Sequence, residues 1–544
     1  MKFIPDLSYM WAMVDARASS MGSAVSGTAY VFLGRLADAV VGFLFSIIGA
    51  RIMGKDLYGY VGATIGIVSI VSLLADMGVP NATTKYVSQY LAKKRLDRIR
   101  AVIFNTVLME AVLGSVAAIL CFGLSDTLAN SVFHTPSLGV YLRIGAPLAL
   151  FMPIINALSA VFQGYQRQEF FSLSVFLSGF TRLGSSWVLL MIHPTVESAL
   201  LGYLLGAIVS STVFGTIILV KILPALGKKT APRMRELKEM LGYSLPVMLT
   251  AASVMLFNWI GTLFLTAFGR PEEISWFNIA YGMVSIPVVL STSIGTAFFP
   301  IVTDLHSRGK HRLLSESYAR VIKFTSLVMV PVVMILVAVG QPFIFVLYGP
   351  SFLPAYEPFI ILSLWGLLRP IAAISNAVSN GVGKPFLNTK ANLICVGLSI
   401  VLCALLVPGG RPYPLNLIPL QGLMGAACAI TISFLVGMAL QVYYSIEVTK
   451  TRLQLDAWGK ALIASTLAAF AIVLMFRELI PSMGLHGLVV DLLITIALGL
   501  LGLGIYLVVI KFMHALDKTD METIEAMPLP MKKTVMKVLR LIAT

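Results

Sequence analysis

The chain has 544 residues, of which 58% are hydrophobic and only 12% are charged, and its formal net charge is +15. A soluble protein of this length carries about twice that share of charged residues, so the composition excludes an ordinary soluble protein. The apolar residues come in runs of about 20, the length that spans a bilayer as a helix. Lipid offers no partner to backbone N–H and C=O groups, so the sequence predicts an all-α, polytopic membrane protein.

The first 25 residues do not have the basic start and apolar core of a cleavable signal peptide. Phe3, Leu7 and Trp11 are interspersed with Asp6 and Asp15. This pattern is typical of a short helix in the membrane interface, and a frayed tail is the alternative.

About fourteen hydrophobic segments long enough to span a bilayer follow in the chain. They are predicted at residues 26–50, 57–78, 101–122, 141–162, 172–191, 198–220, 242–268, 276–301, 321–341, 356–378, 389–407, 420–444, 459–476 and 487–510. Lys and Arg gather in the N-terminal segment, in alternate loops and in the C-terminal tail, whereas the opposite loops carry few. The positive-inside rule therefore predicts a multi-pass protein of the cell membrane with both termini in the cytoplasm.

The densest basic segments are residues 93–100, 228–238 and 308–312. They either record this topology alone or also attract anionic lipid headgroups. The tail from 531 to 541 is expected to form a basic amphipathic helix on the membrane. No basic domain lies outside the predicted spans, so we expect membrane lipids and no nucleic acid as partners.

The first two spans and the seventh and eighth spans share a pattern. Gly54 and Gly269 each open a short outer loop, and the basic residues Lys93 and Arg308 follow them at the same distance. An even offset between repeats predicts two lobes of about six spans in parallel repeat, related by an axis along the membrane normal, plus two C-terminal helices. Chance similarity between apolar segments is the alternative. In a transporter of this architecture, the substrate binds between the lobes near the midplane, with alternating access.

The predicted organisation follows from these spans. It comprises an interfacial N-terminus (1–25), an N-lobe (26–222), a cytoplasmic basic linker (223–241), a C-lobe (242–444), two further spans (445–510) and a basic cytoplasmic tail (511–544).

Arg35, Arg182 and Arg369 lie near the middle of three different predicted spans. A guanidinium at that depth is costly unless it faces a wet interior or a partner. Arginine is also well suited to binding phosphate. Because the first two belong to the N-lobe and the third to the C-lobe, we predict a central cavity that binds an anionic substrate from both lobes.

Two acidic residues accompany the arginines. Asp38 follows Arg35 by three residues on the same helix face, so the two either neutralise each other or line the cavity together. Glu110 lies within the third span and either pairs with Arg182 or binds a coupling cation. Asp38 and Glu110 are therefore the candidates for coupling to H⁺ or Na⁺.

Other polar residues inside or at the ends of spans have less specific roles. For Asn156, Asn258, Asn376 and Asn380, a hydrogen bond between helices is the commoner role, and contact with the substrate is the alternative that places Asn258 in the cavity. Asp76 is expected to contact the loop that follows it, and Asp491 to reach water. The four cysteines form no CxxC pair and are expected to be buried apolar side chains.

Motifs of catalysis are absent from the sequence. It has no DxD, HExxH, GxSxG or phosphate-binding P-loop, and residues 381–384 are too short for the last of these. The sequence therefore predicts no catalytic residue, no metal and no cofactor, and energy that comes from an ion gradient or from the substrate's own gradient.

Four sets of segments carry a resemblance to a known family. They are residues 50–59 (ARIMGKDLYG) with 74–79, residues 277–281 with 299–300, residues 346–356 (VLYGPSFLPAY), and residues 381–385 with 406–408 and 422–427. In order and spacing they resemble the polysaccharide-type lipid-linked oligosaccharide flippases of the multidrug/oligosaccharidyl-lipid/polysaccharide exporter superfamily.

The resemblance implies two helical bundles around a cavity through which a polyprenyl-linked oligosaccharide is flipped. Basic residues of the cavity would meet the phosphate or pyrophosphate, and glycosyltransferases or a polymerase of the same pathway would be partners. The chain departs from the family at residues 258–261, where an Asp often found in the seventh span is replaced, so a coupling role for that span is not implied.

Three functions are compatible with the sequence. A flippase of lipid-linked oligosaccharides accounts for the arginines near the midplane. A cation-coupled multidrug exporter of the same superfamily would instead need acidic, aromatic cavities. A membrane glycosyltransferase or ligase would need a sizeable loop or domain outside the membrane, and no predicted loop is that long.

Overall fold

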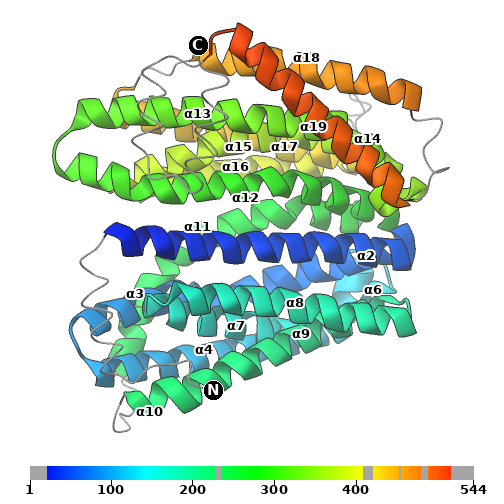
Figure 1. Cartoon of the computed structure of the whole chain (residues 1–544). Coiled ribbons are helices and arrows are strands. Elements are labelled where there is room, and N and C mark those ends of the chain that lie inside the picture. The colour runs from blue at the N-terminus through cyan, green and yellow to red at the C-terminus, as the bar shows by residue number, and fades with distance from the viewer. Residues whose placement is uncertain (1–20, 227–233, 409–420, 452–454, 480–487, 516–544) are drawn as a thin grey trace. The chain divides into compact units, whose positions relative to one another are not determined.

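The computed structural model describes residues 21–226, 234–408, 421–451, 455–479 and 488–515 (Figure 1). These residues form α-helices joined by short turns and one-turn π and 3₁₀ segments, labelled η, and contain no β-strand. Twelve helices in the described residues are long and apolar enough to cross a membrane. The all-α, polytopic class is confirmed. Most of the N-terminal segment 1–25, and the tail beyond 515, lie outside the described residues.

The first half of the described chain contains twelve elements. They are α2 (Met21–Asp76), α3 (Val79–Ala92), α4 (Leu96–Gly123), α5 (Ser125–Thr127), η1 (Leu128–Val132), α6 (Leu138–Gly145), α7 (Leu148–Gly164), α8 (Gln168–Ile192), α9 (Val196–Ile217), η2 (Ile218–Ile222), α10 (Leu223–Ala225) and α11 (Met234–Phe268).

The second half of the described chain contains nine elements. Its elements are α12 (Pro271–Ser307), α13 (His311–Ala338), α14 (Gly340–Tyr348), η3 (Pro350–Ala355), α15 (Tyr356–Gly381), α16 (Pro385–Leu406), α17 (Gly422–Thr449), α18 (Leu455–Leu479) and α19 (Leu488–Phe512).

Helix α2 contains the first two predicted spans. Its apolar part, Tyr30–Asp76, has 47 residues, about twice the length that one crossing needs. Gly54 interrupts the helix with φ 77° and ψ 174°, a conformation that glycine adopts without steric cost, at the point where the sequence predicts a short outer loop. With α2 taken as two crossings, and with the 37-residue helix α12 at the predicted eighth span, the described helices recover the pattern of about fourteen spans.

Internal contacts divide the chain into two compact units. Unit 1 comprises residues 1–278 and 392–430, and unit 2 comprises residues 279–391 and 431–544. The predicted lobe boundaries at 223–241 stay a prediction. Each unit is described by itself below.

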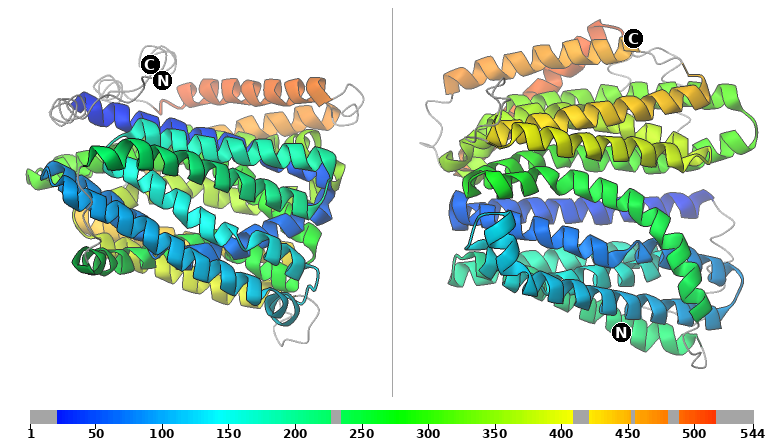
Figure 2. Two further views of the ribbon diagram at one scale, coloured as in Figure 1. Left: turned by 90° about the horizontal axis from the view of Figure 1, so that it is seen from below. Right: turned by 180° about the vertical axis from the view of Figure 1, so that it is seen from behind.

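The core of unit 1 is formed by helices α3, α4, α7 and α9, which lie side by side with α2 and α8 (Figures 1 and 2). Fully buried apolar side chains, including Val79, Ile99, Val161 and Phe214, fill this core. The sequence did not predict α3, a short amphipathic helix. Gly78 begins it with a left-handed φ of 75°, and a Cβ there would lie 2.7 Å from the carbonyl oxygen of Ser244.

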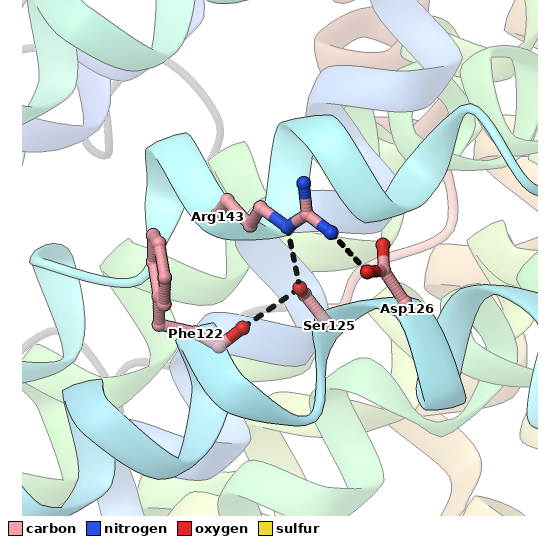
Figure 3. Close-up of polar contacts among 4 residues, drawn as sticks. All are labelled: Phe122, Ser125, Asp126 and Arg143. Carbon is pink, nitrogen blue, oxygen red and sulfur yellow. Dashed lines mark hydrogen bonds and ion pairs between the residues drawn. The ribbon is translucent and has the colours of Figure 1, made fainter.

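A polar clasp closes one end of unit 1, where α4, α5 and α6 meet (Figure 3). Arg143 of α6 donates from Nε to Ser125 Oγ at 3.2 Å and pairs through its terminal nitrogen with Asp126. Ser125 in turn donates to the carbonyl oxygen of Phe122 at 2.8 Å. These contacts lie at the ends of the helices, so they fix the connection between α4, α5 and α6, which we call the corner clasp.

Unit 2 packs around α13. Val302, Tyr318 and Ile374 bring together α12, α13 and α15, and the Tyr318 hydroxyl lies 2.8 Å from Ser375 Oγ. Helices α18 and α19, which cross obliquely in Figure 1, cover another side of α13. There the hydroxyl of Tyr506 donates to the carbonyl oxygen of Leu327 at 2.7 Å.

The cysteines lie in helices and form no disulfide. Cys121, Cys395 and Cys403 are buried, and Cys428 is partly buried. The prediction that they are small buried side chains is confirmed for the first three.

Candidate functional site

The best-defined charged site of unit 1 is centred on Arg182, near the middle of α8. Its Nη2 atom lies 3.6 Å from Oδ1 of Asp38 on α2. Its guanidinium carbon lies 5.2 Å from the ring centroid of Tyr203 on α9. Three helices therefore hold this guanidinium, through one carboxylate and one aromatic face.

Small residues allow α8 and α9 to approach closely beside Arg182. Gly202 and Gly206 form a GxxxG pair on α9, and a Cβ on Gly206 would lie 2.6 Å from the Cα of Arg182. The hydroxyl of Thr181 donates to the carbonyl oxygen of Gly206 at 3.2 Å, and that of Ser185 to Gly202 at 2.7 Å. Such contacts between small residues and hydroxyls are a common way to bring helices together in a membrane.

Helices α2 and α8 also meet through glycine. A Cβ on Gly34 would lie 2.7 Å from the Cβ of Ser172, whose hydroxyl donates to the carbonyl oxygen of Tyr30 at 2.6 Å. A Cβ on Gly179 would lie 2.9 Å from Oδ1 of Asp38. The backbone therefore determines the distance at which Asp38 faces Arg182.

The Arg182 site is only partly compensated. At 3.6 Å the contact with Asp38 exceeds ordinary hydrogen-bond distance. The Arg182 side chain is 27% exposed and that of Asp38 is 43% exposed. The Nε atom of Arg182 is buried and has no hydrogen-bond partner among the described residues. Because the Arg182 side chain is partly exposed and its contact with Asp38 is long, its terminal N–H donors stay available for an oxyanion.

Arg35 does not form the pair with Asp38 that its spacing allows. Its side chain is exposed, and within the described part of the chain it makes no ion pair. Asp38 faces Arg182 instead. Sequence spacing places Arg35 and Asp38 on one helix face, but the side chain of Asp38 is directed toward α8.

Arg369 occupies a separate site in unit 2. Its guanidinium carbon lies 5.9 Å from the ring centroid of Trp365, one turn earlier on α15, and 5.6 Å from that of Phe434 on α17. Trp365 is 2% exposed and stacks on Tyr281 with centroids 5.0 Å apart. Thus Arg182 and Arg369 both lie against aromatic rings, and the four-residue spacing of Trp365 and Arg369 in the sequence already indicates this contact.

Glu110 of α4 lies in a different environment. Its side chain is fully buried, and neither carboxyl oxygen has a hydrogen-bond partner among the described residues. The predicted alternative of a pair with Arg182 is therefore wrong. The charge that acts on Glu110 is Asp76, at the end of α2.

Asp76 itself has two hydrogen-bond partners. It accepts a bond from the backbone N–H of Gly78 and one from Nδ2 of Asn156 on α7, at 3.5 Å. The predicted contact of Asp76 with the following turn and the interhelical role of Asn156 are both confirmed.

An open, surface-facing cavity of about 520 Å³ within unit 1 is lined by α11 and by Asn81 of α3. Its wall is largely apolar, with Val247, Val254 and Met255, and carries the amides of Asn81 and Asn258 beside Trp259. Asn258 lines this cavity, whereas its predicted place in a central cavity between the lobes stays a prediction. Sequence reasoning missed Asn81 and Trp259, because Asn81 lies on the unpredicted helix α3. A few polar groups on an apolar wall are typical of small-molecule sites.

Two other predicted asparagines have structural roles. Asn376 donates to Oε1 of Gln441 on α17 at 3.4 Å, and Asn380 accepts from Nδ2 of Asn388 on α16 at 2.9 Å. By contrast, Asp491 was expected to reach water and is only 2% exposed. That prediction is wrong, because this face of α19 packs inside unit 2.

Two family models match the chain. A family model described as polysaccharide biosynthesis protein matches residues 24–306, and one described as MatE matches residues 246–405.

Relatives with curated descriptions match most of the chain. An uncharacterized membrane protein of Methanocaldococcus jannaschii is 24% identical over 77% of this chain and 83% of its own length. A probable low-salt glycan biosynthesis flippase of Haloferax volcanii is 21% identical over 81% of this chain and 87% of its own.

A solved structure of a lipid II flippase in an inward closed conformation has a TM-score of 0.68 to this chain. It is 17% identical, and the match covers 89% of this chain and 98% of that one. This likeness shows the fold.

Proposed function

Because the chain belongs to the polysaccharide biosynthesis protein family, we propose that it is a flippase for a polyprenyl-(pyro)phosphate-linked oligosaccharide. It moves this lipid from the cytoplasmic to the outer leaflet by alternating access, for assembly of surface polysaccharide or glycoprotein. We place it in the plasma membrane with both termini in the cytoplasm. The observation that carries the proposal is the partly compensated guanidinium of Arg182 in the middle of an apolar helix.

The chemistry of the substrate matches that of Arg182. The charged phosphate or pyrophosphate is the part of the substrate that costs most free energy to move through the bilayer. A planar guanidinium can bind two of its oxygens at once. Asp38, at 3.6 Å, holds the guanidinium in place without occupying it fully. The substrate phosphate can therefore displace the Asp38 carboxylate from the guanidinium, and the carboxylate can later displace the phosphate. A carrier that binds and releases its substrate requires such an exchange.

The cavity lined by α11 and Asn81 would bind other parts of the substrate. The amides of Asn81 and Asn258 can bond sugar hydroxyls, the indole of Trp259 can stack on a sugar ring, and the apolar wall can accept a prenyl chain. We propose no cofactor, and coupling to H⁺ or Na⁺ through an acidic residue of unit 1. Catalytic activity forms no part of the proposal.

A cation-coupled multidrug exporter is the second candidate, favoured by the match of the MatE model to residues 246–405. An organic cation would be repelled by Arg182 unless Asp38 were the dominant charge. Resistance of cells to cationic dyes on overexpression, unchanged by Arg182→Ala, would favour this candidate over the flippase.

The direct test is translocation of a fluorescent polyprenyl-diphosphate oligosaccharide in proteoliposomes. We expect Arg182→Ala to abolish most of the translocation and Arg182→Lys to restore only part of it, because lysine keeps the charge but not the planar fork. Arg143→Ala, which removes an arginine of the corner clasp, is the matched control and should translocate normally. Full translocation by Arg182→Ala and by Arg369→Ala would contradict the anion-binding mechanism.

A further inference from the structure

The carboxyl group of Glu110 is an unusual feature of unit 1. Its side chain has no exposed surface, and both of its oxygens lack a hydrogen-bond partner among the described residues. A buried carboxylate without compensation costs several kcal/mol, so the group needs a bound proton or cation. The Arg182 site does not supply this charge, because Arg182 pairs with Asp38.

The charge that acts on Glu110 belongs to a carboxyl group of α2. Asp76 of α2 acts electrostatically on Glu110, and its side chain is partly exposed. Asn156, which donates to Asp76, is exposed. Ser72 lies one turn before Asp76 on the same helix, is 5% exposed, and its hydroxyl has no hydrogen-bond partner among the described residues. The enclosed carboxyl of Glu110 is therefore influenced by a second carboxyl, that of Asp76, which is partly exposed.

Other charged groups on the elements around α4 have different partners. Lys85 of α3 lies 3.6 Å from the ring centroid of Tyr243, and Arg143 of α6 pairs with the acidic residue of α5. Helix α7 carries no charged residue, and the charges of α11 lie in its first turns, at residues 235–239. Only Asp76 acts on Glu110 among the described charges.

We propose that Glu110 and Asp76 form a proton site of unit 1, in which Glu110 holds the proton in the interior and Asp76 exchanges it with water. Loading forms an O–H bond on a Glu110 carboxyl oxygen, and release returns the proton through Asp76 to solvent. The site is separate from the Asp38–Arg182 pair, on different faces of the fold: α2, α4 and α7 rather than α2, α8 and α9. Only the use of this proton in transport rests on the proposed flippase function.

A proton fits these surroundings better than a metal ion. A proton binds to one carboxyl oxygen, whereas a sodium or divalent ion is coordinated by several oxygens at once. No group of three or more His, Cys, Asp or Glu residues that could hold a metal occurs in the described residues. Helix α4 is unbroken at Glu110, so its backbone carbonyl oxygens are engaged within the helix.

Infrared difference spectroscopy on the purified full-length protein tests the site without any substrate. Raising the pH should deplete a protonated-carboxyl C=O band in the wild type. Glu110→Gln should lose this band, and Glu110→Asp should retain a shifted one. Asp491→Asn, which alters a buried carboxyl of unit 2, is the matched control and should leave the band intact. A band that persists unchanged in Glu110→Gln would overturn the proposal.

Proteoliposomes test the use of the proton. With the same fluorescent substrate, a pH gradient should accelerate translocation by the wild type and by Asp491→Asn, and Glu110→Gln should lose this acceleration. Acceleration by a Na⁺ gradient at equal pH, lost in Glu110→Gln, would overturn the proton in favour of Na⁺. If the wild type translocates nothing under any gradient, the flippase function fails, and the infrared experiment still decides whether Glu110 binds a proton.

Discussion

The two arms of helix α2 contribute an aspartate each to two contrasting sites. Asp38, before the break at Gly54, faces the guanidinium of Arg182 where Gly34 and Gly179 let α2 and α8 approach closely. Asp76, at the end of the second arm, lies beside the enclosed carboxyl of Glu110. The first site combines opposite charges and is partly exposed, whereas the second brings together two carboxyl groups and is closed at Glu110.

This difference separates two tasks that a membrane carrier has to perform. A substrate anion needs a cation that is held in place but still accessible, and the Arg182 site has both properties. A coupling proton needs a group whose charge is costly unless the proton is bound, and Glu110 has that property. The break at Gly54 lies between the two aspartates, so each site is built on its own arm of α2.

The largest expected effect comes from Gly206→Leu. A Cβ at this position already lies 2.6 Å from the backbone of α8 at Arg182, so a larger side chain must push α8 and α9 apart. Overpacking of this kind costs about 1–3 kcal/mol or more. We expect at least about a tenfold loss of translocation, since 1.4 kcal/mol corresponds to a factor of ten.

Gly184→Leu on α8 is the matched control for Gly206→Leu, because a Cβ there meets nothing within 4 Å. Thermal unfolding in detergent, followed by size-exclusion chromatography, separates loss of folding from loss of the site. If Gly206→Leu unfolds and translocates like Gly184→Leu, the close seam of α8 and α9 does not position Arg182.

Asp38→Asn tests whether the carboxylate makes substrate binding reversible. Without the carboxylate, the guanidinium has its full charge available to the phosphate. We expect tighter binding of the fluorescent substrate, about fivefold, and slower turnover, because a partly exposed charge pair contributes at most about 1 kcal/mol. Binding by fluorescence anisotropy and translocation in proteoliposomes measure the two effects.

The control for Asp38→Asn is Asp126→Asn, which removes the carboxylate that pairs with Arg143 at the corner. It should change neither quantity. Weaker binding of the anionic substrate by Asp38→Asn would show that the carboxylate positions the guanidinium and does not compete with the phosphate for it.

Much of this arrangement follows from the sequence. The apolar runs predicted the helices, and the cost of charge in lipid singled out Arg182, Asp38 and Glu110 before any contact was known. The choice of partners did not follow, because helical periodicity says which residues share a face and not which helix that face meets. Asp38 could pair with Arg35 or reach another helix, and only the packing of Gly179 against it selects Arg182.

Short-range backbone features were harder to predict than the spans. Helix α3 follows a left-handed Gly78 and lies in a basic, polar connection between two apolar runs, where hydrophobicity alone predicts no helix. The cavity residue Asn81 was missed with it. Asp491 was assigned to water because it lies near the end of an apolar run, and distance along a helix gives no information on which neighbours cover it.

A smaller effect is expected from the ring beneath Arg182. Tyr203→Leu removes the aromatic face 5.2 Å from the guanidinium carbon, a contact of about 0.5–2 kcal/mol. Substrate affinity should fall several-fold, because the guanidinium loses one of the two contacts that keep it in position. Tyr203→Phe keeps the face and should behave as the wild type in the anisotropy measurement. Equal effects of both substitutions would assign the role to the hydroxyl instead.

The smallest expected effect tests the other site. Asn156→Ala removes one donor to Asp76, and the bond is weak because its length of 3.5 Å is at the limit for hydrogen bonding. Such a bond contributes about 0.5 kcal/mol, so acceleration by a pH gradient should change by less than about twofold. Affinity for the substrate should stay as in the wild type, because the Arg182 site does not include α7. A loss of substrate binding in Asn156→Ala would mean that the two sites are one, and the division of tasks along α2 would have to be abandoned.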